Sequence, residues 1–278
     1  MKQHEVVVTS GGARAMLDRA IGEVMHPVVG PLVEAQRLYV EPSRIAARLA
    51  GPEPEPLVLL DAGLGAGSNA IAAWAASQAL AASARTLEIV SIDRTLAALE
   101  LALQPEHAAA FGFEGDAAIA GRALLSEQRH ANARTRWRLR VGELVSELAQ
   151  EPAASVDVVF WDPFSPRADP AAWSVGTFAA LRRVCRPGAT VHTYSGATAT
   201  RTALLLAGFA VGYGIAGGEK QKRTTLGAVR VEDLSAPLDA RWLERVRRSS
   251  AAWPADAPSD ALARLESLPQ FARADGTQ

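Results

Sequence analysis

A glycine-rich turn after a short apolar run is the part of the sequence best suited to hold a ligand. Residues 59–69 read LLDAGLGAGSN, and glycines at such a turn let the backbone approach a ligand closely. The dinucleotide pattern GxGxxG fails because its last position falls on Ser68. An acid at the strand end suits a ligand with an ammonium group, such as S-adenosylmethionine. We therefore expect this loop to bind such a cofactor through Asp61, Gly63, Gly65, Gly67 and Asn69.

Carboxylates follow two further predicted strands. Asp93 ends the run IVSID at 89–93, where a carboxylate can accept hydrogen bonds from both hydroxyls of a ribose. Glu143 follows the strand before Gly142, where it could accept from the amino group of an adenine. Ligands bind at the carboxyl ends of strands in open α/β sheets. Acids at three successive strand ends therefore favour a nucleotide-like ligand over a simple tight turn.

A fourth acid, Asp162, ends the apolar run 156–161 and begins the segment DPFSP. Two prolines fix the loop around Phe164 and hold this aromatic near a reacting centre. Turn and capping chemistry alone also attract aspartate to such positions. The functional interpretation is a carboxylate placed against a nucleophilic amine, where it accepts a proton or orients the nitrogen lone pair toward a methyl sulfonium.

The elements that must position these residues alternate between strand and helix. Apolar runs at 57–60, 87–92, 156–161 and 189–194 are separated by helical segments at 68–82, 95–103, 170–185 and 198–207. This alternation predicts an α/β, Rossmann-like fold with a seven-stranded, mostly parallel sheet and helices on both faces. The runs 209–215 and 225–231 lack an intervening helix, which predicts an antiparallel C-terminal strand.

Proline-rich and Ala/Pro/Arg-rich segments suggest three regions. We expect an N-terminal extension at 1–56 that caps the substrate side, a central domain at 57–232, and a partly mobile tail at 233–278 with an amphipathic stretch at 241–248.

In the strand 134–141, arginines alternate with Thr135, Trp137, Leu139 and Val141. A solvated edge-strand face is favoured over a phosphate-binding stripe.

Composition limits the class of protein. The 278 residues are 49% hydrophobic and 21% charged with a net charge of −1, which excludes wholesale disorder and argues against non-specific coating of nucleic acid. One cysteine, Cys185, excludes an intramolecular disulfide, and five scattered histidines suggest no metal site. The sequence lacks a signal-peptide pattern and a membrane-spanning apolar stretch, so we expect a soluble, cytoplasmic protein.

Taken together, residues 61–69, Asp93 and the segment from Asp162 through Asp169-Pro170 to Trp173 resemble class I methyltransferases. More narrowly, they resemble the methyltransferase half of the bifunctional tRNA 5-methylaminomethyl-2-thiouridine biosynthesis proteins. Segments at 22–27, 34–40, 186–190, 207–209 and 218–223 are also similar. Pro163 stands where the family has glycine, and the flavin-dependent oxidoreductase half has no counterpart in this sequence.

This resemblance implies methyl transfer from S-adenosyl-L-methionine to an aminomethyl nitrogen on the wobble uridine of tRNA. Asp162 would then serve the amine and also face the cofactor, Phe164 and Trp173 would shape the uridine pocket, and Lys222 with Arg223 would contact phosphate. A separate flavin-dependent oxidoreductase is an implied partner. Glu34 and Tyr39 are further candidates for substrate binding, because the N-terminal extension must cover something and the cofactor mouth is the obvious place.

Two alternatives stay open. The acceptor could be a small-molecule amine or a protein, or the chain could bind the cofactor without turnover. His26 could line the substrate pocket, although a lone histidine is more often structural. We expect His192 to be packed inside a strand and Cys185 to be a buried, inert thiol.

Overall fold

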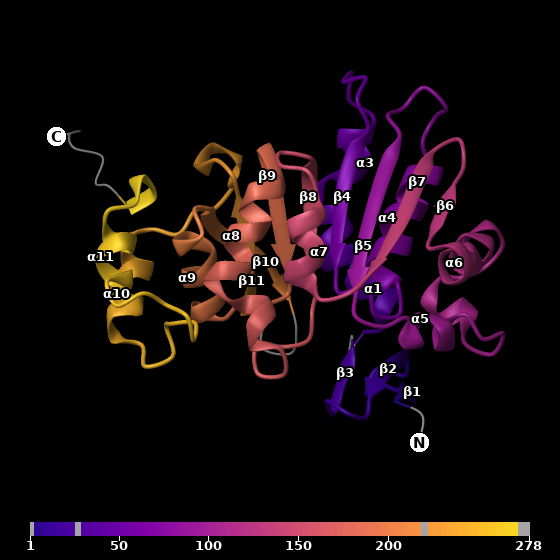
Figure 1. Cartoon of the computed structure of the whole chain (residues 1–278), viewed down its shortest axis with the longest axis horizontal. Coiled ribbons are helices and arrows are strands. Elements are labelled where there is room, and N and C mark those ends of the chain that lie inside the picture. The colour runs from indigo at the N-terminus through magenta and orange to yellow at the C-terminus, as the bar shows by residue number, and fades with distance from the viewer. Residues whose placement is uncertain (1–2, 26–28, 218–221, 272–278) are drawn as a thin grey trace.

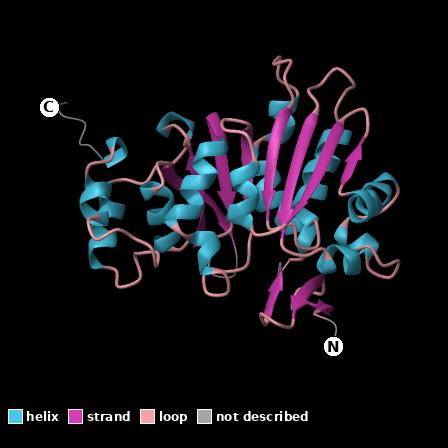
Figure 2. Ribbon diagram, viewed as in Figure 1, coloured by secondary structure: helices cyan, strands magenta, loops and turns pink. Residues whose placement is uncertain are grey.

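The computed structural model describes residues 3–25, 29–217 and 222–271, and a twisted eight-stranded sheet lies at its centre (Figures 1 and 2). The strand order is β10-β11-β9-β8-β4-β5-β7-β6. Pairings among β9, β8, β4, β5 and β7 are parallel, whereas β11 is antiparallel to both of its neighbours. The strands are β4 Leu57–Ala62, β5 Leu87–Asp93, β6 Arg129–Ala131, β7 Thr135–Val141, β8 Val156–Trp161, β9 Cys185–Thr193, β10 Ala210–Gly217 and β11 Lys222–Ala228.

Helices cover both faces of this sheet, as the alternation predicts. In β4, Leu57 and Leu59 join one core cluster while Val58 and Leu60 join the other. Because both faces are buried, the strand consists of apolar residues without alternation until Asp61. The helices of the central region are α4 Ser68–Gln78, α5 Ala97–Ala102, η2 Ala108–Phe111, α6 Asp116–Glu127, α7 Leu144–Gln150, α8 Val175–Val184 and α9 Thr198–Leu206.

Two local expectations are corrected. The helix expected at 170–185 is a short η3 (Pro170–Trp173) followed by α8, because Ser174 is extended and its hydroxyl caps α8 by accepting from the backbone N–H of Thr177 at 3.1 Å. The sheet has eight strands rather than seven, since the three-residue β6 pairs antiparallel with β7. The arginine-bearing strand β7 is therefore not the edge.

The arginines of β7 lie on one face, as expected, and Thr135, Trp137 and Leu139 are buried on the other. The arginines pair with carboxylates: Arg136 contacts Glu88 at 2.9 Å, and Arg138 and Arg140 both contact the buried Glu151. Because these guanidinium groups are already paired with carboxylates, they are poorly suited to bind a phosphate. A structural role for the arginines of β7 is therefore favoured.

The N-terminal residues form a small sheet and a run of short helices beside the glycine-rich loop that follows β4. Strands β1 (His4–Val8), β2 (Arg14–Asp18) and β3 (Glu23–Met25) are antiparallel and separate from the main sheet (Figure 1). They are followed by α1 Pro31–Ala35, the π-helix η1 Gln36–Val40, α2 Glu41–Ser43 and α3 Ile45–Leu49. Tyr39, Ile45 and Leu49 are buried in the core cluster beneath the sheet, which fixes this segment on the central region.

The C-terminal residues continue the hydrophobic core through η4 Val231–Asp233, α10 Ala240–Arg248, α11 Ala261–Glu266 and η5 Pro269–Phe271. The amphipathic stretch is α10, whose Trp242 is 2% exposed and stacks on Phe271 with ring centroids 6.0 Å apart. The side chain of Gln270 bonds both backbone groups of Val211. Residues 233–271 thus pack against the rest of the structure. The division of the chain into regions at 1–56, 57–232 and 233–278 stays a prediction. Within the described ranges, no helix is long and apolar enough to cross a membrane.

If the C-terminal helices are part of the core, replacing Trp242 by alanine should destabilise the whole domain. Loss of a fully buried tryptophan leaves a cavity and costs about 3–5 kcal/mol. Urea denaturation of Trp242→Ala measures this loss, and the exposed neighbour variant Arg241→Ala should stay within about 0.5 kcal/mol of the parent protein. A loss below about 1 kcal/mol for Trp242→Ala would show that α10 is only loosely attached.

Candidate active site

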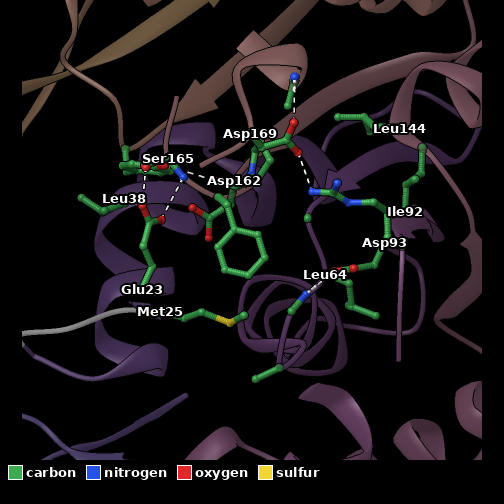
Figure 3. A pocket seen from close by; sticks show the side chains of 18 of the residues that line it. Glu23, Met25, Leu38, Leu64, Ile92, Asp93, Leu144, Asp162, Ser165 and Asp169 are labelled. Atoms are coloured by element: carbon green, nitrogen blue, oxygen red, sulfur yellow. Dashed lines mark hydrogen bonds and ion pairs between the residues drawn. The ribbon is translucent and has the colours of Figure 1, made fainter. Parts of the chain in front are cut away.

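A cavity of about 960 Å³ opens at the carboxyl ends of the parallel strands, where ligands bind in this architecture. Its lining comes from the glycine loop after β4, the ends of β5 and β7, the loop after β8, and β3 with the helices that follow it. Figure 3 shows Asp93, Ile92 and Leu144 on one side, and Glu23, Ser165 and Leu38 on the other, with Asp162 between them. The cavity therefore has two ends, separated by Asp162.

The glycine loop lies directly against the loop that carries Asp162. Gly63 has a φ of +86°, and a Cβ at this position would lie 2.6 Å from the backbone oxygen of Asp162. Gly67 also has a φ of +86°, and a Cβ there would meet the Phe113 ring at 2.9 Å. Only glycine allows both the dihedral angles and the close approach. Gly63 and Gly65 line the cavity, whereas Gly67 lies behind it.

Asp93 ties this loop to the end of β5. One of its carboxylate oxygens accepts from the Gly65 backbone N–H at 2.8 Å and the other from the Thr95 N–H at 3.2 Å. Burial raises the pKa of Asp93, while these backbone hydrogen bonds oppose the shift. Asp93 lines the cavity, and so does the exposed Glu143 just before α7. Both acids predicted to hold the nucleoside part of a cofactor thus line the same cavity.

Asp61 lies beneath the loop and is almost fully buried, at 1% exposure. Its Oδ2 accepts from the Ser91 hydroxyl at 2.8 Å, but Oδ1 has no hydrogen-bond partner among the residues that the structure describes. Burial raises the pKa of Asp61 to about 8, with smaller contributions from the charges of Asp162 and Asp93. A buried carboxylate oxygen without a partner is costly unless a cation or donor lies nearby. Without a ligand Asp61 is therefore protonated at neutral pH, and a cationic group bound nearby would favour its charged form.

Both oxygens of Asp162 are held by side chains from different parts of the chain. The Tyr39 hydroxyl donates to Oδ1 at 2.7 Å, and the Asn69 amide donates to Oδ2 at 2.6 Å. Burial, and then the charge of Asp162, raise the pKa of Tyr39 well above its usual value, so this hydroxyl remains a donor. Tyr39 and Asn69 do not line the cavity. The structure instead places them where they orient Asp162.

The loop after Asp162 is fixed at three successive residues. The Tyr194 hydroxyl donates to the Pro163 carbonyl at 3.2 Å, and the Trp173 indole N–H donates to the Phe164 carbonyl at 2.8 Å. Glu23 accepts from the backbone N–H of Ser165 at 3.2 Å and also from its hydroxyl. Phe164 lines the cavity, whereas the buried Trp173 supports it from behind.

Glu23 and Tyr194 are among the site residues that sequence reasoning missed, as are Arg37 and Arg94 of the cavity lining. Glu23 lies 142 positions from Ser165, and Tyr194 lies 31 positions from Pro163. No local sequence pattern predicts contacts between residues so far apart in the chain. Glu23 does lie in one of the segments, 22–27, that resemble the methyltransferase family.

The remaining predicted residues take different places. Glu34 lines the cavity. Arg223 is exposed outside the lining, with its guanidinium over the Tyr213 ring at 4.9 Å. Lys222 begins β11, but its side chain falls outside the described residues, as do His26 and the segment 218–221.

Two further groups that the sequence suggested were structural are buried. Burial lowers the pKa of His192 to about 3 and raises that of the Cys185 thiol to about 12. Both side chains are therefore neutral at ordinary pH. Over the part of the chain that the structure describes, no group of three or more histidine, cysteine or acidic side chains is arranged to hold a metal ion.

The cavity is strongly acidic. Its described lining contains six carboxylates, Glu23, Glu34, Asp93, Glu143, Asp162 and Asp169, against the two arginines Arg37 and Arg94. Arg94 is paired with Asp169 at 2.7 Å. This excess of negative charge favours cationic ligands, both a sulfonium cofactor and a protonated amine.

Comparison with known sequences gives the same family. A model described as S-adenosyl-L-methionine-dependent methyltransferase matches residues 119–230. The tRNA 5-methylaminomethyl-2-thiouridine biosynthesis bifunctional protein MnmC of Pseudomonas aeruginosa is 33% identical over 226 residues, which are 76% of this chain and 33% of that protein. MnmC of Pseudomonas fluorescens is 29% identical over 273 residues, 92% of this chain and 36% of that protein. The chain thus spans about one third of the length of these curated relatives.

Solved structures agree on the fold. MnmC2 from Aquifex aeolicus has a TM-score of 0.71 at 20% identity, covering 96% of this chain and 87% of that one. Spermidine synthase from Thermotoga maritima has a TM-score of 0.52 at 9% identity, covering 96% and 81%. The predicted class I, Rossmann-like fold and the dependence on S-adenosyl-L-methionine are confirmed.

The burial of Asp61 predicts a specific dependence of stability on pH. Its pKa is raised from 3.8 to about 8 in the folded state, so between these values the folded protein holds a proton that the unfolded chain releases. The free energy of unfolding should therefore fall as pH rises through this window. Asp61→Asn lacks this proton. The free energy of unfolding of the variant minus that of the parent protein should therefore increase with pH, by up to about 1.4 kcal/mol per pH unit.

Urea denaturation at pH 5.5 and pH 7.5 measures this difference. The exposed acid variant Asp116→Asn is the matched control and should show no such change. An equal stability difference at both pH values for Asp61→Asn would contradict the raised pKa.

Proposed function

We propose that this chain, an S-adenosyl-L-methionine-dependent methyltransferase, methylates the nitrogen of an aminomethyl group on the wobble uridine of tRNA. The observation that carries this proposal is Asp162, held by Tyr39 and Asn69 between the glycine loop and Phe164 in an acidic cavity. The relatives' name, tRNA 5-methylaminomethyl-2-thiouridine biosynthesis, supports the same acceptor.

The residues at one end of the cavity suit the cofactor. Asp93 would accept from the ribose hydroxyls and Glu143 from the adenine amino group. Asp61 lies outside the cavity lining, and a cationic cofactor bound in the cavity would favour its ionised form. When bound, S-adenosyl-L-methionine supplies a methyl group on a positively charged sulfur. Gly63 and Gly65 line the cavity and present no side chain to a ligand there.

Asp162 is the group we assign to the acceptor amine. An aminomethyl group is protonated at neutral pH, and the acidic lining favours its entry as a cation. The ammonium must lose a proton before nitrogen can attack, and a carboxylate within reach can accept that proton or orient the lone pair. Tyr39 and Asn69 fix the carboxylate, so that the nitrogen is aligned rather than merely bound.

Phe164 offers an apolar face for the uracil ring at the other end of the cavity. Its backbone is held by Trp173, and the next residue is held by Glu23. Both contacts tie the loop to elements distant in sequence and limit its movement. Trp173 therefore acts on the uridine pocket through Phe164, and Arg223 remains a candidate for a phosphate contact.

A separate flavin-dependent oxidoreductase would complement this activity. The relatives are bifunctional, and the present chain spans about one third of their length. We propose that such an enzyme supplies the free amine on tRNA and that both proteins work in the cytoplasm.

The direct test uses bulk tRNA from cells that lack this protein. The purified chain is incubated with that tRNA and methyl-labelled S-adenosyl-L-methionine, and the digested nucleosides are resolved by mass spectrometry. We expect label on a 5-aminomethyl-type uridine. Absence of label from every nucleoside, with protein that binds the cofactor, would refute tRNA as acceptor and favour a small amine or a protein.

Asp162→Asn separates catalysis from cofactor binding. Loss of a positioned proton acceptor typically reduces the rate by about 10²–10⁴-fold, and we expect kcat to fall within this range. Binding of S-adenosylhomocysteine, measured by calorimetry, should change much less. Glu5→Gln, an exposed acid that pairs with Arg19 away from the cavity, is the control and should retain full activity. Full activity in Asp162→Asn would contradict the assigned role.

A further inference from the structure

We propose that Arg37 and Arg167 form a phosphate-binding rim at the mouth of the acidic cavity. This rim would select an amine carried by a polyanionic strand over a free polyamine. The inference rests on the proposed function and deepens it, because it assigns the surface that binds the backbone of the acceptor.

Arg37 is exposed and lines the cavity from η1. Among the residues that the structure describes, no carboxylate pairs with its guanidinium. Its neighbour Leu38 lies beside Glu23 and Ser165 in Figure 3, which places this part of η1 at the acceptor end, away from Asp93. Arg37 is thus a free cation bordering a cavity whose lining is otherwise dominated by carboxylates.

Arg167 lies at the same end. Its side chain is 85% exposed and its nearest carboxylate is Glu23, at 3.7 Å. Both oxygens of Glu23 already accept from Ser165. A long contact to an exposed guanidinium contributes little, so Arg167 is available to an incoming anion.

Two other arginines near the site, Arg94 and Arg223, already have partners within the protein. Arg94 is paired with Asp169 at 2.7 Å, and the guanidinium of Arg223 donates to the Gly214 carbonyl at 3.2 Å and covers Tyr213. Arg122 on α6 is exposed and also without a carboxylate partner in the described ranges, but it does not line the cavity. Arg37 lines the cavity, and Arg167 lies outside the lining but contacts Glu23, which belongs to it. These two positions distinguish Arg37 and Arg167 from Arg122.

A cavity with an acidic interior and a cationic rim suits a ligand that places a positive charge inside the cavity and negative charges at its mouth. An amine on a nucleotide base can enter the cavity while the flanking phosphates remain at the mouth, as occurs when a base is turned out of a strand. Arginine pairs well with phosphate through its planar guanidinium. A free polyamine gains from the interior but meets like charge at the rim. Charge placement alone therefore discriminates between these two classes of amine.

The test measures binding of bulk tRNA by fluorescence anisotropy over a range of salt concentrations, and needs no turnover. Each phosphate contact contributes about 0.7–0.9 to the slope of log affinity against log salt concentration. The double variant Arg37→Gln/Arg167→Gln should bind tRNA at least about 10-fold more weakly at low salt and lose about 1.5 from that slope. Arg122→Gln, a matched exposed arginine, should bind like the parent protein.

Turnover on the same tRNA is recorded in parallel, and thermal midpoints confirm folding. An unchanged affinity and slope in the double variant would overturn the rim, even if the parent protein methylates tRNA. A reduced slope without methylation of any nucleoside would support the rim and refute the proposed acceptor group. An equal loss in Arg122→Gln would show a diffuse charge effect and would also overturn the proposal.

Discussion

The site depends on one close contact, the approach of the glycine loop to the loop that follows β8. β4 and β8 are adjacent and parallel, so their carboxyl ends meet. At that junction a Cβ on Gly63 would lie 2.6 Å from the Asp162 carbonyl oxygen, and its φ of +86° is unfavourable for other residues. Because the loops touch, Asn69 at the start of α4 reaches the Asp162 carboxylate. The glycine loop and Asp162 are thus held together as one unit.

The N-terminal segment completes this unit from the opposite side. Tyr39 holds the second oxygen of Asp162, Glu23 holds Ser165, and Met25 lies against Gly65. The same segment supplies Glu34 and Arg37 to the cavity lining. A region that the sequence presents as an extension therefore contributes both to the positioning of the carboxylate and to the recognition of charge. Its small sheet has no pairing with the main sheet, so its contribution comes through side chains.

The sequence was most informative where function and local structure coincide. Glycines at 63, 65 and 67 and the acids at strand ends follow from local patterns, because a parallel sheet gathers strand ends at one edge. The partners of Asp162 could not be assigned in this way, since Tyr39 is 123 positions away. The break at Ser174 was missed because apolar periodicity continues across it, and β6 is too short to show a period. The acidic cavity with arginines at its mouth emerges only from the tertiary arrangement.

The central claim is that Asp162 divides the cavity into a cofactor end and an acceptor end. A crystal structure with S-adenosylhomocysteine tests this claim most directly. We predict that the ligand contacts Asp93 and the glycine loop, with its sulfur toward Asp162, and that the surface between Phe164 and Glu23 stays free for the acceptor. A ligand bound against Glu23 and Phe164, or one whose sulfur points away from Asp162, would contradict the account.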